Sequence, residues 1–422
     1  MPNFNPEIFK AYDIRGIYGR DFDDDFAFKL GAALVLYLKR RRFLVALDDR
    51  PSSSGLAESF ARGVVASGGD VELFGRAATP FFNFAFGELA VDGGVMVTAS
   101  HNTAEYGGFK VFGDGGRIIG LESGLDKIKS IILENQFPVS KQTGKMTQDG
   151  KSEILKKYID FVIKKSEITN HTLSDMRIRI DAPVLARNEV VELKNRLNLK
   201  LTEDGHEVMF SFDSDADRIY VSDAKGNRLG ADLIVGLLVK DMTGFWKKPK
   251  VVCDLRFSRG VKEAFHKMGA KTTRSRVGRY FMKENMLKRK ADLGGELAGH
   301  IFFKEADNNE LPLLAMLKIL KIMVRTGKSI NELVEPFKTW ANSGEINLAT
   351  GNWPVAAGKL KEKYKDGKID ELDGVTVEYS DWWFNVRPSN TEPIVRTVVE
   401  AQSHELLNQK TEEVLEIIKA AQ

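Results

Sequence analysis

The sequence of 422 residues predicts an α/β protein of several domains. A chain of this length exceeds what one hydrophobic core ordinarily organises, so we expect two to four domains. Short apolar runs alternate with longer segments of helical spacing, which is typical of sheets covered by helices. Polar loops also recur at intervals of roughly 80 to 115 residues, about one small domain each, and they are centred on Ser100, Asp215, Glu296 and Arg387.

The first domain is expected to span residues 1–148. Its first helix shows apolar helical spacing and ends in a basic run, which complements the helix dipole. A polar segment over 136–152 predicts the boundary to the next domain. The expected helices are 26–39, 56–67 and 121–135, and the expected strands are 43–47, 71–74, 95–97 and 109–112.

The same patterns predict the elements of the three later domains. A second domain over 149–246 is expected to contain helices 154–165, 190–197 and 232–240 and strands 177–181 and 219–221. The segment 245–250 is interpreted as a linker into a third domain over 247–340, with strand 251–255 and helices 260–268 and 312–323. The last domain, 341–422, is expected to contain strands 346–349, 375–379 and 382–386 and helices 355–365 and 406–420.

Composition and charge narrow the function classes. The net charge of +3 is small for this length, which argues against a general nucleic-acid binder. The single cysteine, Cys253, excludes an internal disulfide and suits a reducing compartment. The N-terminal segment has no signal-peptide core, and every apolar run is far shorter than a membrane span. We therefore expect a cytoplasmic protein that contacts neither nucleic acid nor membrane.

A serine loop lies between two expected strands, in the stretch VMVTASHNTAEYGGFKVF. Ser100 stands beside His101, and Lys110 follows on the second strand. A hydroxyl with neighbouring cationic groups can hold a nucleophile and a negative charge together. An upstream segment, FKAYDIRGIYG, contains Arg15 two residues after Asp13, which taken alone reads as a surface ion pair.

An aspartate loop follows the next apolar run, in the string FSFDSDADR. Asp213, Asp215 and Asp217 alternate with small residues, so an extended loop can point all three toward one ion. Carboxylates at this density repel one another, and a hard dication is the usual compensation. The sequence therefore predicts a divalent metal site.

Two further loops carry polar groups suited to a sugar phosphate. The string GGELAGH places Glu296 and His300 on a glycine-rich loop, where they can hydrogen-bond vicinal hydroxyls. The string RPSNTEP supplies a guanidinium, hydroxyls and an amide shaped for a phosphate, namely Arg387, Ser389, Asn390 and Thr391.

Together these strings resemble the α-D-phosphohexomutase superfamily, the phosphoglucomutase and phosphomannomutase enzymes. The resemblance covers essentially the whole chain and implies three related α/β mixed-sheet domains and a smaller α+β C-terminal domain around a central cleft. It implies a catalytic phosphoserine domain, a trimmed magnesium-loop domain, a sugar-binding domain and a phosphate-binding C-terminal domain. The chain departs from the family pattern at Thr103, Gly107, Ser214, Ala298 and 307–310.

The resemblance implies a role for each candidate residue. Ser100 is the phosphoserine, surrounded by His101, Lys110 and Arg15, and the acid/base is either Lys110 or His101. Arg218 is implied as a phosphate contact. Arg279, after the V-G turn, is either a contact to the sugar phosphate or an exposed arginine at a helix start.

The implied reaction is reversible phosphoryl transfer between the 1 and 6 positions of a hexose phosphate, glucose or mannose. Phosphorylated Ser100 gives a bound 1,6-bisphosphate, and Mg²⁺ on the three aspartates is the implied cofactor, with hexose 1,6-bisphosphate as activator. The expected partners are small hexose phosphates, and we expect a monomer or weak dimer. Two alternatives stay open: a phosphoglucosamine mutase, which shares every motif, and a sugar-phosphate-binding protein with decayed catalysis.

Overall fold

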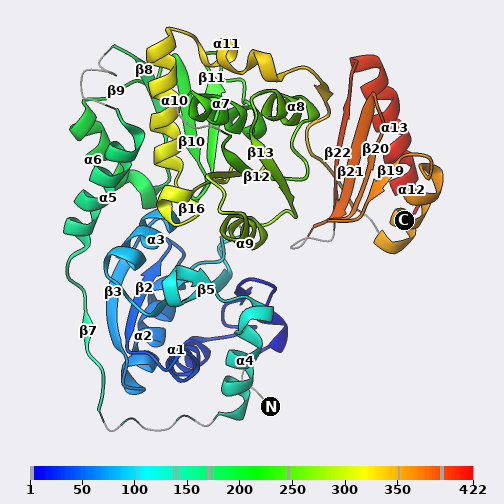
Figure 1. Cartoon of the computed structure of the whole chain (residues 1–422). Coiled ribbons are helices and arrows are strands. Elements are labelled where there is room, and N and C mark those ends of the chain that lie inside the picture. The colour runs from blue at the N-terminus through cyan, green and yellow to red at the C-terminus, as the bar shows by residue number, and fades with distance from the viewer. Residues whose placement is uncertain are drawn as a thin grey trace. The chain divides into compact units, whose positions relative to one another are not determined.

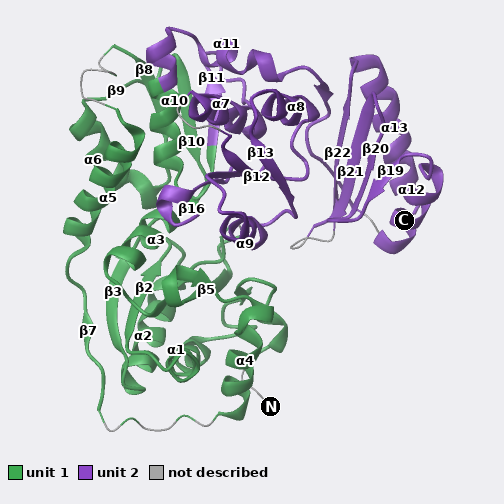
Figure 2. Ribbon diagram, in the orientation of Figure 1, with its two compact units in different colours: residues 1–219, 309–321 green, residues 220–308, 322–422 purple. Residues whose placement is uncertain are grey.

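The computed structural model describes residues 4–100, 102–135, 137, 140, 142–168, 173, 175–244, 248–349, 352–389 and 394–421. These residues form four sheets and the helices that cover them (Figure 1). The chain divides into two compact units (Figure 2): unit 1 comprises residues 1–219 and 309–321, and unit 2 comprises residues 220–308 and 322–422.

The first sheet of unit 1 is mixed. Its strands are β1 (Ile14–Ile17), β2 (Arg42–Leu47), β3 (Asp70–Arg76), β4 (Gly93–Val97), β5 (Tyr106–Gly113), β6 (Arg117–Ile118) and β7 (Met146–Thr147). They lie in the order β1-β5-β4-β2-β3-β7, with β6 beside β5. β5 runs antiparallel to both β1 and β4, whereas β2 runs parallel to β4 and β3. The loop between β4 and β5 therefore connects two neighbouring strands at one end of the sheet.

Four helices accompany this sheet: α1 (Asp24–Leu38), α2 (Ser53–Ala66), α3 (Thr79–Glu88) and α4 (Leu125–Glu134). α1 and α2 cross closely because Gly31 has no side chain; a Cβ there would lie 2.1 Å from the carbonyl oxygen of Phe60. α3 is absent from the expected helices, and its Phe82 ring lies 5.0 Å from the Phe112 ring of β5. This contact anchors the N-terminus of α3 near the aspartate loop described below.

Unit 1 also contains part of a second sheet. Its strands β8 (Arg177–Asp181), β9 (Lys200–Leu201) and β10 (Val208–Phe212) run parallel in the order β10-β8-β9. A short 3₁₀ turn over Val184–Ala186 leads from β8 into α6 (Arg187–Leu197). Tyr158 of α5 (Lys151–Ser166) packs on Phe81 and Phe84 of α3, each at a ring distance of 5.3 Å. β11 (Ile219–Asp223) leads from unit 1 into unit 2.

Unit 2 opens with a sheet of β12 (Lys250–Asp254), β13 (Lys271–Ser275), β14 (Leu293–Gly295) and β15 (Ile301–Phe303). The order is β13-β12-β14-β15, with β15 antiparallel to β14 and the other pairs parallel. The helices of this part are α7 (Ala231–Thr243), α8 (Arg259–Lys267), α9 (Arg279–Arg289) and α11 (Ile330–Val334). β16 (Asn309–Glu310) and the first part of α10 (Pro312–Thr326) belong to unit 1.

The last sheet is antiparallel and belongs to unit 2. Its strands are β17 (Ala341–Asn342), β18 (Ile346–Ala349), β19 (Lys368–Asp370), β20 (Val375–Glu378), β21 (Trp382–Pro388) and β22 (Ile394–Ala401). They lie in the order β17-β22-β21-β20-β19, and β18 also pairs with β22. α12 (Trp353–Lys363) and α13 (His404–Lys419) lie beside these strands (Figure 1). The two helices share an apolar core with the strands.

The sheets and the helices that cover them confirm the predicted α/β fold class. Each sheet lies inside one of the four ranges expected for the domains, whose boundaries stay a prediction. Residues 245–247 of the expected linker lie outside the described residues. Within the described part of the chain, no helix has both the length and the apolar character needed to span a bilayer.

Candidate active site

The serine loop of unit 1 leaves β4 in a constrained conformation. Ser100 has a φ of +54°, in the left-handed region that a residue with a Cβ seldom adopts. Its backbone N–H donates to Oγ1 of Thr98 at 2.9 Å, which fixes the turn. Strain of this kind persists only where surrounding contacts impose it, and it is common at reactive residues.

Arg50 provides those contacts. Its guanidinium donates to the backbone carbonyls of Ser100 and Asn102, both at 2.6 Å. It also donates to those of Thr103 at 2.6 Å and Tyr106 at 3.0 Å. One half-buried arginine thus donates to four carbonyls of the serine loop.

Asp48 orients that arginine. Its carboxylate accepts from the backbone N–H of Arg50 at 3.1 Å and from Nε at 3.0 Å, and it also accepts from the Ser53 hydroxyl. The sequence shows Asp48 and Arg50 as an aspartate-x-arginine string, but neither is among the predicted site residues. The signal that could have found them is this string directly after an apolar strand.

Arg15 reaches the serine loop from β1. Its Nη1 donates to Oδ1 of Asn102 at 2.6 Å, and its Nη2 pairs with Asp13. The ion pair that the sequence suggests is therefore present, and the same guanidinium also contacts the loop. His101, the other predicted neighbour of Ser100, lies outside the described residues.

The three aspartates after β10 gather around one point. Asp213, Asp215 and Asp217 each offer a carboxylate oxygen, and these oxygens lie within 4.8 Å of one another. Asp215 and Asp217 are buried. Burial and then repulsion from Asp217 and Asp215 raise the pKa of Asp213 to about 8. Ala216, between two of them, has a φ of +54° that turns the loop.

This loop fits a hard divalent cation. Oδ1 of Asp215 is buried and has no hydrogen-bond partner among the described residues. Three clustered carboxylates form the oxygen donor set that Mg²⁺ prefers, and a cation would remove the repulsion that raises the pKa of Asp213. The acidic triad can therefore hold a metal ion.

Lys110 of β5, the strand that follows the serine loop, contacts the aspartate loop within unit 1. Its Nζ donates to Oδ2 of Asp215 at 2.8 Å and lies 3.6 Å from Oδ2 of Asp217. At the start of α3, Thr79 donates to Asp215 through its hydroxyl at 3.2 Å and through its backbone N–H at 2.9 Å. Arg218, the predicted phosphate contact, donates its backbone N–H to Asp213 at 3.0 Å.

The predicted sugar loop of unit 2 is held from the start of α9. Oε1 of Glu296 accepts from the backbone N–H of Gly278 at 2.7 Å. The backbone N–H of Glu296 donates to the carbonyl of His300 at 3.0 Å. Glu296 and His300 are both buried. Gly278 has a φ of +129°, which favours glycine, and Arg279 is the first residue of α9.

The predicted phosphate arginine is buried in the same unit. Arg387 is 2% exposed at the end of β21, and burial lowers the pKa of its guanidinium. Its Nε donates to Oδ2 of Asp373 at 3.2 Å. Ser389 donates its N–H to Ile394 at 2.8 Å, while Asn390 and Thr391 lie outside the described residues.

A partly buried ionic network in unit 2 was not predicted. Asp254, at the end of β12, accepts from Arg256 and from the backbone N–H of Leu297 in the sugar loop at 2.9 Å. Glu345 pairs with Arg256 and accepts from Arg396 of β22 at 3.2 Å. Because its members come from distant stretches, no local sequence signal reveals the network.

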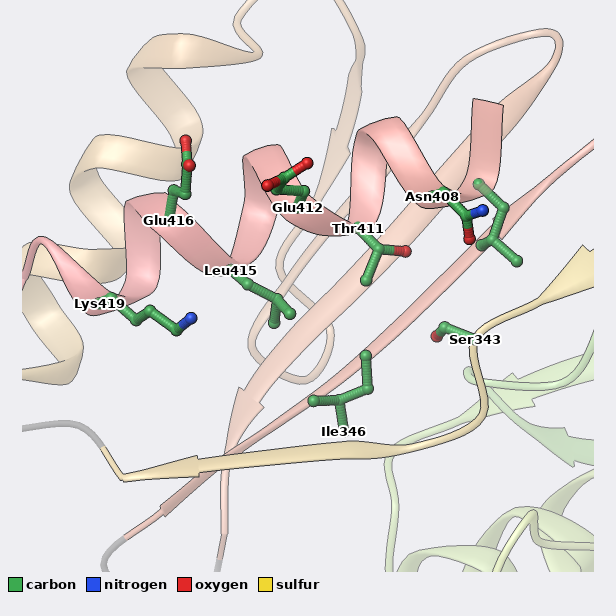
Figure 3. A pocket seen from close by; sticks show the side chains of 9 residues that line it. Ser343, Ile346, Asn408, Thr411, Glu412, Leu415, Glu416 and Lys419 are labelled. Carbon is green, nitrogen blue, oxygen red and sulfur yellow. The ribbon is translucent and has the colours of Figure 1, made fainter. Parts of the chain in front are cut away.

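A cavity of unit 2 lies away from the predicted site residues. Its volume is about 410 Å³, and Figure 3 shows Ile346 of β18 and Leu415 of α13 directed into it. None of the residues that line it is a predicted site residue. The candidate active site therefore rests on the loops and not on this hollow.

The chain matches models of a known family. Three family models match: phosphoglucomutase/phosphomannomutase alpha/beta/alpha domain I over residues 6–139, domain III over 230–340 and the C-terminal domain over 345–417. A phosphomannomutase of Methanocaldococcus jannaschii is 34% identical, and the alignment covers 97% of each chain.

Solved structures share the fold. A phosphoglucomutase/phosphomannomutase family protein of Burkholderia thailandensis has a TM-score of 0.84 at 25% identity, covering 99% of this chain and 98% of that one. An N-acetylphosphoglucosamine mutase of Aspergillus fumigatus, solved in complex with GlcNAc-6P and magnesium, has a TM-score of 0.57 at 15% identity, covering 82% and 93%. The chain belongs to the phosphoglucomutase/phosphomannomutase family of the α-D-phosphohexomutase superfamily, and it is a phosphohexomutase, an isomerase that moves a phosphoryl group.

Proposed function

We propose that the enzyme interconverts a hexose 6-phosphate and a hexose 1-phosphate through a phosphoserine at Ser100 and a bound 1,6-bisphosphate. Mannose phosphate is the first substrate to assay, because the relative from Methanocaldococcus jannaschii is named a phosphomannomutase. The observation that supports the proposal most directly is the contact of Lys110, on the strand that follows the serine loop, with Asp215 of the acidic triad in the same unit.

In the forward step, a free hydroxyl of the sugar attacks the phosphorus on Ser100. The new bond from the hydroxyl oxygen to phosphorus forms, the bond from phosphorus to Oγ breaks, and the proton of the hydroxyl is released to a base. The bisphosphate then reorients, and Oγ forms a bond to the other phosphorus. The bond from that phosphorus to the sugar oxygen breaks, and this oxygen takes back the proton held by the base, so no co-reactant is consumed. Lys110 and His101 remain the two candidates for the proton transfer.

The acidic triad would hold the cation through Asp213, Asp215 and Asp217. A bound Mg²⁺ would neutralise negative charge on the transferring phosphoryl group. The Aspergillus mutase with the same fold was solved with magnesium, in line with this choice of ion. Arg15 and Lys110 are cationic side chains of β1 and β5 in the first sheet, and we assign them to the same charge.

The substrate's non-reacting phosphate would bind the loop around Arg387, with Ser389, Asn390 and Thr391. Glu296 and His300 would orient the sugar hydroxyls, and we assign Arg218 and Arg279 to phosphate contacts. A phosphate grip separate from the transfer site lets either end of the sugar be presented to Ser100.

The test is phosphorylation of Ser100. After incubation with a hexose 1,6-bisphosphate, intact-mass measurement should show one added phosphate on the enzyme and none on the Ser100→Ala variant. A coupled assay across mannose, glucose and glucosamine 1-phosphates then identifies the sugar. Full turnover by Ser100→Ala would disprove the phosphoserine mechanism.

A further inference from the structure

The turn formed by Asp373 and Gly374 packs directly on the phosphate arginine. Gly374 has a φ of +72°, and a Cβ there would lie 2.2 Å from the carbonyl oxygen of Val386 and 2.7 Å from Cα of Arg387. Only a glycine therefore fits between this turn and β21. The carbonyl of Asp373 also accepts from Asn385 at 3.0 Å, so the turn is fixed to the strand on two sides.

The carboxylate of Asp373 contacts two other elements at once. Its Oδ2 accepts from Nε of Arg387 at 3.2 Å and from the backbone N–H of Val277 at 2.9 Å. The Asp373 side chain is 11% exposed and that of Arg387 is 3% exposed, so water competes weakly for these bonds. Because Arg387 donates to Asp373 through Nε, its two Nη atoms can donate to a bound anion.

Val277 precedes the glycine that holds the sugar loop. The next backbone N–H, on Gly278, donates to Glu296 at 2.7 Å. A continuous series of contacts therefore runs from Arg387 through Asp373 and the turn at residues 277–278 to Glu296. It joins the last sheet of unit 2 to its first sheet.

We propose that Asp373 is a positioning residue that aligns the phosphate-binding arginine, Arg387, with the sugar-binding glutamate, Glu296. The proposal rests on the roles assigned to those two residues under the proposed function. Phosphate and sugar recognition are then not independent, because both depend on one carboxylate oxygen.

The matched control is Asp370. It lies three residues earlier, and its carboxylate also joins the last sheet to the first sheet of unit 2, through Arg274 at 2.8 Å. It contacts none of Arg387, Val277 or Glu296 in the described contacts. Asp370→Asn therefore reports the cost of losing an ion pair between the two sheets without disturbing the proposed alignment.

The experiment compares Asp373→Asn and Asp370→Asn in steady-state assays with hexose 1-phosphate. We expect Asp373→Asn to raise KM about tenfold, since the charge-assisted hydrogen bond to Arg387 is replaced by a weaker one to a neutral amide, with a smaller change in kcat, and Asp370→Asn to leave both nearly unchanged. Asp373→Asn should also change the ratio of specificity constants for mannose and glucose substrates, because the turn that holds Glu296 loses its partner.

Double variants separate alignment from general destabilisation. Asp373→Asn combined with Arg387→Ala should weaken substrate binding by less than the product of the two single losses, because the effect of Asp373 on phosphate binding passes through Arg387. Losses that multiply, or a KM that falls in Asp373→Asn, would overturn the proposal. An unchanged KM in Arg387→Ala itself would instead disprove the phosphate-binding role of Arg387, so the two failures are distinguishable.

Discussion

Ser100 and Ala216 place the two reactive loops of unit 1 in left-handed turns, each with a φ of +54°. Such a conformation costs of the order of 1 kcal/mol or more for a residue with a Cβ, and neighbouring contacts must offset it. Thr98 and Arg50 do so for Ser100. For the aspartate loop, the N–H of Ala216 donates to the carbonyl of Asp213 at 3.1 Å.

Removing metal should abolish activity reversibly. The carboxylates of Asp213, Asp215 and Asp217 repel one another without a cation, and one buried oxygen of Asp215 has no partner among the described residues. We expect a chelator to stop turnover and added Mg²⁺ to restore it. We expect Asp215→Ala to be inactive both with and without added Mg²⁺. Undiminished turnover by Asp215→Ala after metal removal would contradict the assignment.

Ala298 should limit discrimination between sugars. The family pattern has a serine at this position, between Glu296 and His300, so one neutral hydrogen bond is missing. Such a bond is worth about 0.5 to 1.5 kcal/mol, or roughly a threefold to tenfold change in specificity constant. We expect Ala298→Ser to raise the specificity constants of glucose and mannose substrates unequally without altering metal dependence. Equal effects on the two epimers would show that position 298 does not contact the distinguishing hydroxyl.

At the scale of elements, the serine loop is held by a residue that follows a third strand, not one of the two strands that the loop connects. Arg50 follows β2, and its guanidinium fixes carbonyls in the connection from β4 to β5. Because β2 and β4 run parallel as neighbours, the residues after β2 lie beside the residues after β4. The topology therefore brings Arg50 to the nucleophile.

Arg50→Lys should slow phosphoryl transfer more than it weakens substrate binding. A lysine ammonium lacks the planar fork that reaches four carbonyls, so the loop around Ser100 loses its fixed geometry. We expect the single-turnover rate of transfer from hexose 1,6-bisphosphate to Ser100 to fall roughly 10- to 100-fold, with KM nearly unchanged. Arg40→Lys, at an exposed ion pair with Asp114, is the control. A smaller amplitude of the single-turnover reaction with an unchanged rate constant in Arg50→Lys would indicate general unfolding instead.

Most elements follow from local patterns, and the exceptions have physical reasons. The strands on both sides of the serine loop were predicted within a few residues, because their apolar runs end abruptly at polar residues. The helix α3 was not predicted, because its aromatic residues at 81, 82, 84 and 86 do not mark one helical face. Its position depends on packing against β5 and α5, which no local window contains.

At the scale of the whole molecule, motifs identify the loops but not the residues that hold them. Ser100, the three aspartates, Glu296 and Arg387 stand in strings that are recognisable by themselves. Asp373 and Glu345 stand in unremarkable strings and acquire their roles only when distant segments meet. Contacts over such separations are set by sheet topology, which the sequence pattern leaves undetermined.

Stability should also depend on a buried carboxyl far from these strings. Glu189 of α6 is 3% exposed, and its Oε1 has no hydrogen-bond partner among the described residues. It lines a small cavity of about 10 Å³ with Tyr158 and Ala216, and Lys151 is the nearby cation. Burial raises the pKa of Glu189 from 4.5 to about 7, so the folded protein favours the neutral form.

The raised pKa of Glu189 makes the free energy of unfolding depend on pH. Since the pKa is higher in the folded state, the stabilising contribution of the proton is complete below about pH 4.5 and is lost as pH rises through about 7. The loss amounts to about 3 kcal/mol at most, for a pKa difference of about 2.5. We expect Glu189→Gln, which keeps the size of the side chain without its charge, to raise the Tm at pH 8 and leave it nearly unchanged at pH 5. Calorimetry at both pH values, with Glu192→Gln on the same helix as control, measures the difference; an equal Tm shift at pH 5 and pH 8 would mean that Glu189 does not titrate in the folded protein.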